Sequence, residues 1–531
     1  MHPIIRPIVA IVGLMVAMGT AVATPRPVWV MGSEVLGETG DDGVAVFKGI
    51  PYAQAPVGRW RWRSPQPLTR LPSPFWATAW MPACPQSDSN TRWYRSVAER
   101  IDPNHGAVSV QAPPTMSEDC LGLNVWVPPH SPTDGPMAVL VWIHGGGHRD
   151  GYAYEPNYEG AALAKRGQLI VVSIAYRLNV LGFLPPRISN APDLPLGMQD
   201  ELAALTWIHA HIAAFGGDPQ NVTIAGESAG AADVGELWLE PKAQRLFTRA
   251  ISQSGGFFLL DHYRRAQAVA RSKRFYRDHF QTLDPSALRG VPADELVAFA
   301  ARDSLDAAYR PPRADQRRSS DPAWRLQSHA IRHDLLVGSN QDEWWMYLQS
   351  GSMTRSAYMK TFPKPAQQLL SAIGADIRDP AASLDAVYSL LNFHCPVVLM
   401  ADAVAAPNHA YVYRFAQVRQ GAQRLGSYHG AEIPYVFNRH DPWLPTSPED
   451  RQLSVQMMDY WAAFAKTGNP NGASVSSGAF AEIAPWPQYT RAHPQWMYLQ
   501  STPTPQEATI APLCRRLWPW VYRTTRDYGA D

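Results

Sequence analysis

The sequence predicts an α/β protein with a large, mostly parallel, twisted central sheet flanked by helices, and a small antiparallel sheet near the N-terminus. Two observations favour a mostly parallel sheet. Short apolar runs of strand length alternate with helical stretches along most of the chain. Glycine-rich or polar segments follow directly after several of these strands, as at the ligand-binding edge of an open parallel sheet. Residues 27–80 instead hold short strands and turns, which predict the small antiparallel sheet.

Composition limits the class of partner. The chain has 531 residues, a formal net charge of +1 and 18% charged residues. This balance indicates no basic face for nucleic acid and no acidic tail. The length would suit two or three average domains, but large α/β enzymes reach it as one unit. Because no internal repeat or low-complexity segment divides the chain, we expect one domain over residues 24–531.

Residues 1–23 have the pattern of a cleavable signal peptide. Arg6 supplies the positive charge, residues 8–18 the apolar core, and Ala21-Val-Ala23 the small-residue cleavage site. A membrane anchor is the alternative, but the apolar core is short for a span. We therefore expect an exported bacterial protein, periplasmic or secreted, with no stable membrane anchor.

Four cysteines fit an exported protein. Cys84, Cys120, Cys395 and Cys514 form an even set, which predicts two disulfides in an oxidising compartment. Spacing alone leaves all three pairings open, and four free thiols are the alternative.

The first half of the chain leads to a glycine run. We interpret residues 84–120, polar and rich in proline, as a long surface loop. The apolar strand at residues 138–143 then runs into His144-Gly-Gly-Gly147. Consecutive glycines leave backbone N–H groups unshielded, so these groups can approach a substrate oxygen and form part of an oxyanion hole. A second apolar strand at residues 169–175 and a helix at about 200–215 follow.

The next motif has the form of a nucleophile elbow. An apolar strand at residues 222–225 is followed by Gly226-Glu-Ser-Ala-Gly230 and then by a helix at residues 231–239. In a strand–G-x-S-x-G–helix arrangement the tight turn exposes the serine hydroxyl. Ser228 is therefore the candidate nucleophile, although the five-residue pattern alone is weak evidence.

The second half supplies an acid and a histidine after further strands. Strands are expected at residues 249–254, 334–337, 410–415 and 496–499, and helices across residues 262–330. Glu343 follows the strand at 334–337, and His429 follows the strand at 410–415. A serine needs a histidine to accept its proton, and the histidine needs a carboxylate to fix its tautomer.

Together these segments resemble the type-B carboxylesterases of the α/β-hydrolase superfamily, the group that includes the cholinesterases. The resemblance runs from residue 47 to beyond 470 and covers nearly all of the chain after the signal peptide. It rests on the following segments: FKGIPYAQAPVG (47–58), SEDCLGLNVWVP (117–128), VWIHGGGH (141–148), AYRLNVLGFL (175–184), FGGDPQNVTIAGESAG (215–230), ISQSGG (251–256), VGSNQDE (337–343), YHGAEIPYVF (428–437) and FAKTGNPN (464–471).

The resemblance implies an α/β-hydrolase fold and a serine esterase that needs no cofactor or metal. Ser228 would be the nucleophile, His429 the general base and acid, and Glu343 the orienting acid, with neighbouring Asp342 as the alternative. The implied oxyanion hole consists of the N–H groups of Gly146, Gly147 and Ala229. The implied disulfides are Cys84–Cys120 and Cys395–Cys514, and the implied structural ion pairs are Arg61–Glu118 and Arg177–Asp200.

Some neighbouring residues have open roles. Glu227 could tune charge at the site or brace the elbow, and Ser254 could support the acid by a hydrogen bond. Trp344 and Trp345, directly after the acid, could line a pocket or belong to the core.

The chain also departs from the family pattern. His148 replaces the usual aromatic residue after the three glycines, and Asp233 replaces a small hydroxyl residue behind the elbow. No tryptophan stands shortly before Cys120, where cholinesterases carry their choline-binding ring. Without that ring we expect poor turnover of choline esters.

We conclude that the sequence predicts an exported hydrolase of uncharged, small-molecule carboxylic esters. Two alternatives remain open. One is a specialised hydrolase of lactones, polyesters or amides with the same three residues. The other is a non-catalytic adhesion or binding relative. Protein partners are left unknown by the sequence.

Overall fold

A computed structural model describes most of the chain after residue 26. The described residues are 27–102, 115–130, 135–187, 194–259, 263–303, 305, 312–313, 326, 331, 333–348, 354–371, 373, 379–404, 406–471 and 483–527. The predicted signal peptide, residues 1–23, lies outside them.

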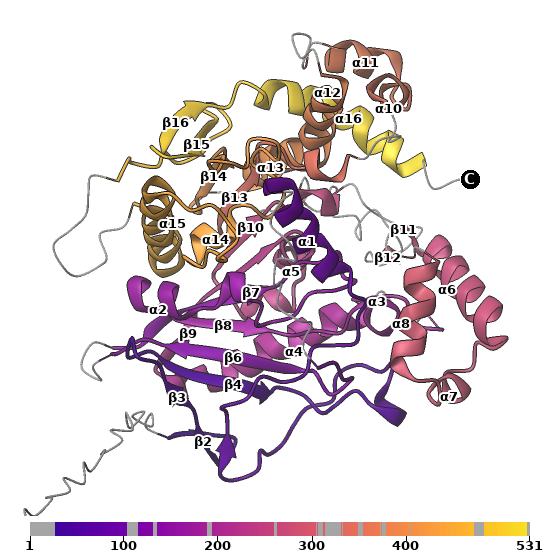
Figure 1. Ribbon diagram of the computed structural model, residues 1–531, viewed down its shortest axis with the longest axis vertical. Coiled ribbons are helices and arrows are strands. Elements are labelled where there is room, and N and C mark those ends of the chain that lie inside the picture. The colour runs from indigo at the N-terminus through magenta and orange to yellow at the C-terminus, as the bar shows by residue number, and fades with distance from the viewer. Residues whose placement is uncertain are drawn as a thin grey trace, which may run out of the picture.

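The central sheet has eleven strands in the order β16-β15-β14-β13-β10-β9-β7-β8-β6-β4-β3 (Figure 1). From β8 to β15 all neighbouring strands are parallel, and antiparallel pairs occur only at the two sides of the sheet. The mostly parallel sheet predicted from the sequence is confirmed. Its strands are β3 (Glu38–Thr39), β4 (Ala45–Pro51), β6 (Gly122–Val127), β7 (Met137–Ile143), β8 (Ile170–Ile174), β9 (Gly217–Glu227), β10 (Arg249–Gln253), β13 (Asp334–Asn340), β14 (Ala410–Phe415), β15 (Gln495–Leu499) and β16 (Thr504–Glu507).

Helices cover both faces of this sheet. Every residue of β7 is buried, and its side chains alternate between two hydrophobic clusters. Val139 and Val141 face the cluster that includes α4 (Leu196–His211), whereas Leu140 and Trp142 face the cluster that includes α15 (Pro448–Thr467). A strand with two buried faces is apolar throughout, which is why β7 shows no polar alternation in the sequence.

The remaining helices follow the predicted alternation with strands. They are α2 (Ala161–Gly167), α3 (Asn179–Gly182), α5 (Ala229–Leu239), α6 (Arg265–Phe280), α7 (Pro285–Leu288), α8 (Ala293–Arg302), α10 (Arg355–Met359), α11 (Lys364–Ser371), α12 (Pro380–Ser389), α13 (Cys395–Ala403), α14 (Ile433–Val436) and α16 (Ala511–Asp527). The run from α12 to α13 is long and apolar enough to cross a membrane, but 78% of its most apolar window is buried inside the protein.

The small N-terminal sheet contains β1 (Val28–Val30), β2 (Ser33–Leu36) and β5 (Phe75–Trp76). β1 and β2 are antiparallel as predicted, but β2 and β5 are parallel. The sheet is therefore mixed, because β5 returns after a long excursion of the chain and not through a hairpin.

The prediction of an irregular loop at residues 84–120 was wrong in part. Helix α1 (Ser89–Ile101) begins five residues after Cys84. Its apolar residues Trp93, Val97 and Ile101 are four residues apart and pack in or against the hydrophobic cluster that includes α15. This single sparse stripe is the only apolar periodicity among many polar residues, so the segment reads as a loop.

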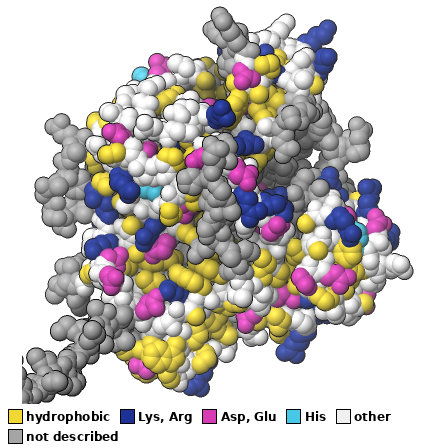
Figure 2. Space-filling view, viewed as in Figure 1, with side chains coloured by type: hydrophobic (Ala, Val, Ile, Leu, Met, Phe, Trp, Pro, Cys, Tyr) yellow, Lys and Arg dark blue, Asp and Glu magenta, His cyan; other side chains and the backbone are white. Residues whose placement is uncertain are grey.

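Disulfides join Cys84 to Cys120 and Cys395 to Cys514, which confirms both implied pairings. The implied ion pairs are present as well. Arg61 Nε lies 2.7 Å from a Glu118 carboxylate oxygen, and Arg177 Nη2 lies 2.7 Å from Asp200 Oδ1. On the face shown in Figure 2, acidic and basic side chains are interspersed, in keeping with the net charge of +1.

Candidate active site

Ser228 stands at the turn between β9 and α5 in a strained conformation. Its backbone has φ 53° and ψ −123°, in the left-handed half of conformational space. The flanking glycines serve a different need, which is space. A Cβ on Gly226 would lie 2.6 Å from the carbonyl carbon of Gly230, and one on Gly230 would lie 2.1 Å from the backbone oxygen of Ile143. The two glycines thus allow the turn to pack closely against β7, and the strained backbone conformation lies at Ser228.

The side chains of Ser228, His429 and Glu343 form one hydrogen-bonded chain. His429 Nε2 lies 2.8 Å from Ser228 Oγ, and His429 Nδ1 lies 2.6 Å from Glu343 Oε2. Glu343 is fully buried, and its other carboxylate oxygen accepts a 2.7 Å hydrogen bond from the N–H of Asn340. Asp342 points elsewhere and accepts a 2.8 Å hydrogen bond from the N–H of Ser427. The geometry therefore favours Glu343 over Asp342 as the partner of the histidine.

Three residues that line the cavity beside Ser228 have backbone N–H groups without an acceptor among the described residues. Within the described residues, the N–H groups of Gly146 and Gly147 donate no hydrogen bond. Ala229 is the first residue of α5, and the N–H of a first helical residue has no acceptor within its own helix. All three residues line the same cavity as Ser228. The N–H groups are therefore available to a negatively charged oxygen.

Glu227 adds negative charge beside the histidine. Its Oε1 lies 3.4 Å from His429 Nε2 and makes no hydrogen bond among the described residues. Burial lowers the pKa of His429, but the charges of Glu227 and then Glu343 outweigh burial and raise the pKa to about 9. Burial raises the pKa of Glu227 itself to about 8. Glu227 raises the pKa of His429 only while its own carboxylate is ionised. The two groups therefore titrate as a pair.

The buried carboxylate of Glu432 connects the segment before Glu343 to neighbouring elements. Glu432 accepts hydrogen bonds from the Asn340 side chain at 2.6 Å and from Gln253 at 3.1 Å. It thereby joins β10, the end of β13 and the segment that follows His429. Glu432 was not among the residues predicted to act at the site. Its place three residues after His429 was the available signal.

Ser254 does not support Glu343. Its hydroxyl makes no hydrogen bond within the described part of the chain, and its N–H donates to the backbone oxygen of Gly338. Of the possibilities left open by the sequence, the hydrogen bond from Ser254 to the acid is not present, and the N–H of Asn340 donates to Glu343 instead.

The cavity above Ser228 measures about 430 Å³ and has several aromatic residues in its lining. The lining includes Trp93, Tyr94, Tyr158, Trp344, Tyr347 and Phe393. Trp344 stacks on Tyr388 at 4.5 Å, whereas Trp345 donates its indole N–H to the backbone oxygen of Arg424 and is not part of the lining. Of the two tryptophans after the acid, only the first lines the pocket.

Trp93 brings an indole ring into this cavity. Its indole N–H donates to the Tyr347 hydroxyl at 3.2 Å, and its ring centroid lies 6.2 Å from that of Tyr428. The segment closed by the Cys84–Cys120 disulfide, here called the disulfide loop, therefore does bring a tryptophan into the cavity. The tryptophan comes from α1 and not from the residues just before Cys120. No tryptophan stands shortly before Cys120, as noted from the sequence, but α1 supplies one to the cavity. Poor choline-ester turnover therefore stays a prediction.

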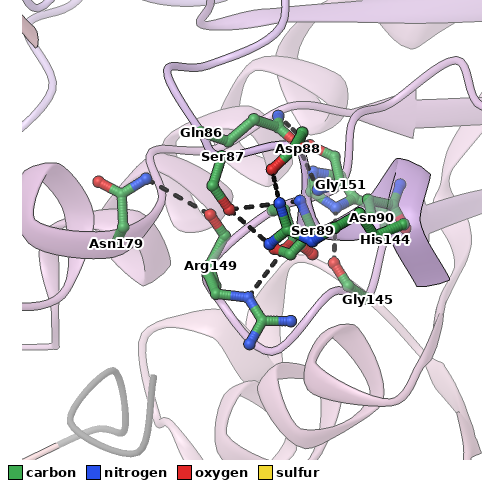
Figure 3. A network of polar contacts seen from close by, with 12 residues as sticks. Gln86, Ser87, Asp88, Ser89, Asn90, His144, Gly145, Arg149, Gly151 and Asn179 are labelled. Carbon is green, nitrogen blue, oxygen red and sulfur yellow. Dashed lines mark hydrogen bonds and ion pairs between the residues drawn. The ribbon is translucent and has the colours of Figure 1, made fainter. Parts of the chain in front are cut away.

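The start of α1 is attached to the loop that carries Gly146 and Gly147 (Figure 3). The Gln86 side chain exchanges hydrogen bonds with the backbone of Gly151, at 2.8 Å in each direction. Ser89 donates to Asp150 Oδ2, which also accepts from Arg149 Nε at 2.8 Å. Since the N–H of Asp150 donates to the backbone oxygen of Gly146, α1 and the glycine loop form one polar unit.

A doubly wound sheet with serine, acid and histidine in contact beyond the carboxyl ends of its strands defines an α/β-hydrolase. The chain matches the carboxylesterase family over residues 22–515 and belongs to that family. It is 32% identical to acetylcholinesterase of Bungarus fasciatus, over 89% of this chain and 82% of that protein. It is 31% identical to para-nitrobenzyl esterase of Bacillus subtilis (strain 168), over 84% of this chain and 90% of that protein.

Solved structures agree with this assignment. A carboxylesterase of Geobacillus stearothermophilus superimposes with a TM-score of 0.75 at 30% identity, over 93% of this chain and 99% of that one. A PNB esterase superimposes with a TM-score of 0.76 at 28% identity, over 92% and 99%. The predicted family and fold are confirmed, and the chain is a carboxylic ester hydrolase of the serine hydrolase type.

Proposed function

We propose that this protein is an exported carboxylesterase that hydrolyses uncharged esters through an acyl-enzyme on Ser228. His429 acts as general base and then as general acid, and Glu343 holds it in the required tautomer. One observation carries the proposal: His429 bridges Ser228 at 2.8 Å and buried Glu343 at 2.6 Å. Export is supported by the signal-like sequence of residues 1–23 and by the two disulfides.

The geometry suits a two-step reaction. His429 Nε2 accepts the proton of Ser228 Oγ while this oxygen attacks the ester carbonyl. The imidazolium then protonates the leaving alcohol, and the acyl group remains on Ser228. Water follows the same route in the second step and releases the acid.

The N–H groups of Gly146, Gly147 and Ala229 stabilise the negative charge on the carbonyl oxygen. Donors aimed at such an oxyanion contribute about 3 kcal/mol each to the transition state. Glu343 has no substrate contact in this scheme. Its contribution is to hold a proton on His429 Nδ1, so that Nε2 is free to accept one.

The decisive experiment is Ser228→Ala. We expect kcat on p-nitrophenyl esters to fall by about 10⁴-fold or more, because no other group supplies the nucleophile. A fluorophosphonate probe should label the native protein and fail to label the variant. Activity close to that of the native enzyme in the variant would refute the assignment. Absence of labelling in the folded native protein would favour the non-catalytic relative.

Neighbouring carboxylates provide a matched test of the acid. Glu343→Gln should lower kcat by about 10⁴-fold, because the amide stabilises the wrong histidine tautomer. Asp342→Asn should retain most of the activity, since Asp342 contacts only the loop backbone near Ser427 among the described residues. The opposite ranking would transfer the role to Asp342.

A second substrate class is favoured by Trp93 and Glu227. An indole face and a carboxylate in one cavity suit a cationic alcohol group such as choline, and one similar protein is an acetylcholinesterase. A panel of p-nitrophenyl, choline, lactone, polyester and amide substrates separates the possibilities. The proposal of uncharged esters fails if choline esters have the higher kcat/KM at equal acyl length.

A further inference from the structure

The two positions at which the chain departs from the family pattern are in contact. His148 Nε2 lies 2.8 Å from Asp233 Oδ2, and both side chains are almost completely buried. His148 follows the glycines of the loop at 145–147, whereas Asp233 lies on α5, five residues after Ser228. A polar pair thus replaces the aromatic and small hydroxyl residues that the family usually has at these two positions.

Two further contacts hold His148 in an uncommon backbone conformation. Its backbone has φ +56°, and its backbone oxygen accepts a 2.7 Å hydrogen bond from the N–H of Asn179. Its ring stacks on Phe183 with a centroid distance of 4.2 Å and an interplanar angle of 21°. Non-glycine residues with positive φ are uncommon, so this turn persists only because its surroundings hold it.

Asp233 has a second buried partner in Glu201 of α4. Oδ1 of Asp233 and both carboxylate oxygens of Glu201 have no hydrogen-bonding group near them in the described residues other than each other. Burial, and then the charge of Asp233, hold the pKa of Glu201 well above its usual range. This direction favours the protonated form of Glu201, which can donate to Asp233. The other oxygen of Asp233 remains available to His148.

The pair connects the two elements that carry the proposed oxyanion hole. Gly146 and Gly147 lie on the loop that ends at His148, and Ala229 lies at the start of α5. A shift of about 1 Å in such donors is enough to lower the reaction rate by about 100-fold.

We propose that His148 and Asp233 are positioning residues, which hold the glycine loop against α5 so that the N–H groups of Gly146, Gly147 and Ala229 converge on one point. This inference rests on the proposed oxyanion hole. Both residues also line the cavity, but the proposed role requires no contact with the substrate, since His148 is held between Asp233 and Phe183.

The test is His148→Phe, which keeps a ring on Phe183 but removes the hydrogen bond to Asp233. Fluorophosphonate titration gives the number of active serines, so that kcat is measured per active site. We expect kcat for p-nitrophenyl acetate to fall by about tenfold with KM within about twofold of the native value. The inhibition constant of a trifluoromethyl ketone, which forms an oxyanion on Ser228, should rise by a similar factor.

Two further variants serve as controls. Asp233→Asn can still accept from His148 and can donate to Glu201, so its kcat should remain within about threefold of the native value. His279→Phe removes a similar pair away from the cavity. There the histidine lies 2.6 Å from Asp303, and its ring lies 4.4 Å from that of Phe299. This variant should leave both kcat and KM unchanged.

An unchanged kcat per active serine in His148→Phe would overturn the inference, as would an equal loss in Asp233→Asn. If His148→Phe yields no titratable protein, Asp233→Ser takes its place. Its kcat per active serine should then fall by about tenfold, and an unchanged kcat would overturn the inference. Ser228→Ala separates this failure from that of the proposed function. Activity that survives in Ser228→Ala refutes the oxyanion hole as assigned, whatever His148→Phe does.

Discussion

The nucleophile elbow and the disulfide loop border the same cavity but are built differently. At the elbow, backbone contacts decide the shape, since Gly226 and Gly230 leave no room for a Cβ and Ser228 takes a strained φ of 53°. In the disulfide loop, side chains decide it. Gln86 and Ser89 attach α1 to the glycine loop, and Trp93 reaches the cavity from the next turn of that helix.

From this difference we expect changes at the elbow to affect the reaction, and changes in the disulfide loop to affect mainly which substrate binds. The elbow follows a central strand that is buried on both faces, so small changes there disturb the core and the reaction together. The disulfide loop lies outside the sheet. A side chain that takes no part in its attachment to the glycine loop, such as Trp93, can therefore change with less effect on the reaction. In Figure 1, α1 lies beside elements from the middle and the C-terminal part of the chain, which is why its role depends on the fold.

Among the variants that test this comparison, the largest effect should come from Gly230→Ala. The new Cβ would lie 2.1 Å from the backbone oxygen of Ile143, so the elbow must move away from β7. We expect a loss of about 100-fold in kcat/KM and about 1–3 kcal/mol in the free energy of unfolding. Gly290→Ala is the control, because its Cβ would meet only Ala287 O at an ordinary 3.6 Å. Equal behaviour of the two variants would show that the elbow is not constrained by its backbone.

An intermediate effect should come from Glu227→Gln. Neutral His429 is the active base, so kcat/KM falls as the pH falls through the pKa of this histidine. Burial lowers that pKa and the charges of Glu227 and Glu343 raise it to about 9, so removal of the Glu227 charge should lower it. The acid limb of the pH profile should therefore move to lower pH. Glu236→Gln, in the same cavity, should leave the limb in place. A shift to higher pH in Glu227→Gln would contradict this account.

The smallest effect should come from Trp93→Ala in the disulfide loop. Loss of one aromatic contact corresponds to about 0.5–1.5 kcal/mol, or roughly a 2- to 12-fold rise in KM for aryl esters. We expect kcat to be unchanged, since Trp93 lies in the cavity wall and has no contact with Ser228 among those described. Trp345→Ala, outside the lining, should change neither constant. If kcat falls and KM stays constant in Trp93→Ala, the two regions are not separable.

Most of the fold and of the candidate site was predictable. Apolar runs located the strands, because central parallel strands are buried on both faces. Ser228, Glu343 and His429 each follow such a strand, so the parallel sheet brings them to one edge. Helix α1 was not predictable, because one stripe of Trp93, Val97 and Ile101 gives little signal among polar neighbours. The sequence left a hydrogen bond of Ser254 open, because such a bond depends on side-chain direction, which spacing does not give.

The sequence by itself determined the chemistry. Gly226-Glu-Ser-Ala-Gly230, the glycines at 145–147, and an acid and a histidine after later strands are local signals, because each depends on a backbone turn at a strand end. Only the tertiary structure decided which side chains surround that chemistry. It placed Trp93 in the cavity, chose Glu343 over Asp342, and joined His148 to Asp233 across 85 positions of the chain. Contacts of this kind depend on the packing of distant elements, and no local pattern in the sequence encodes them.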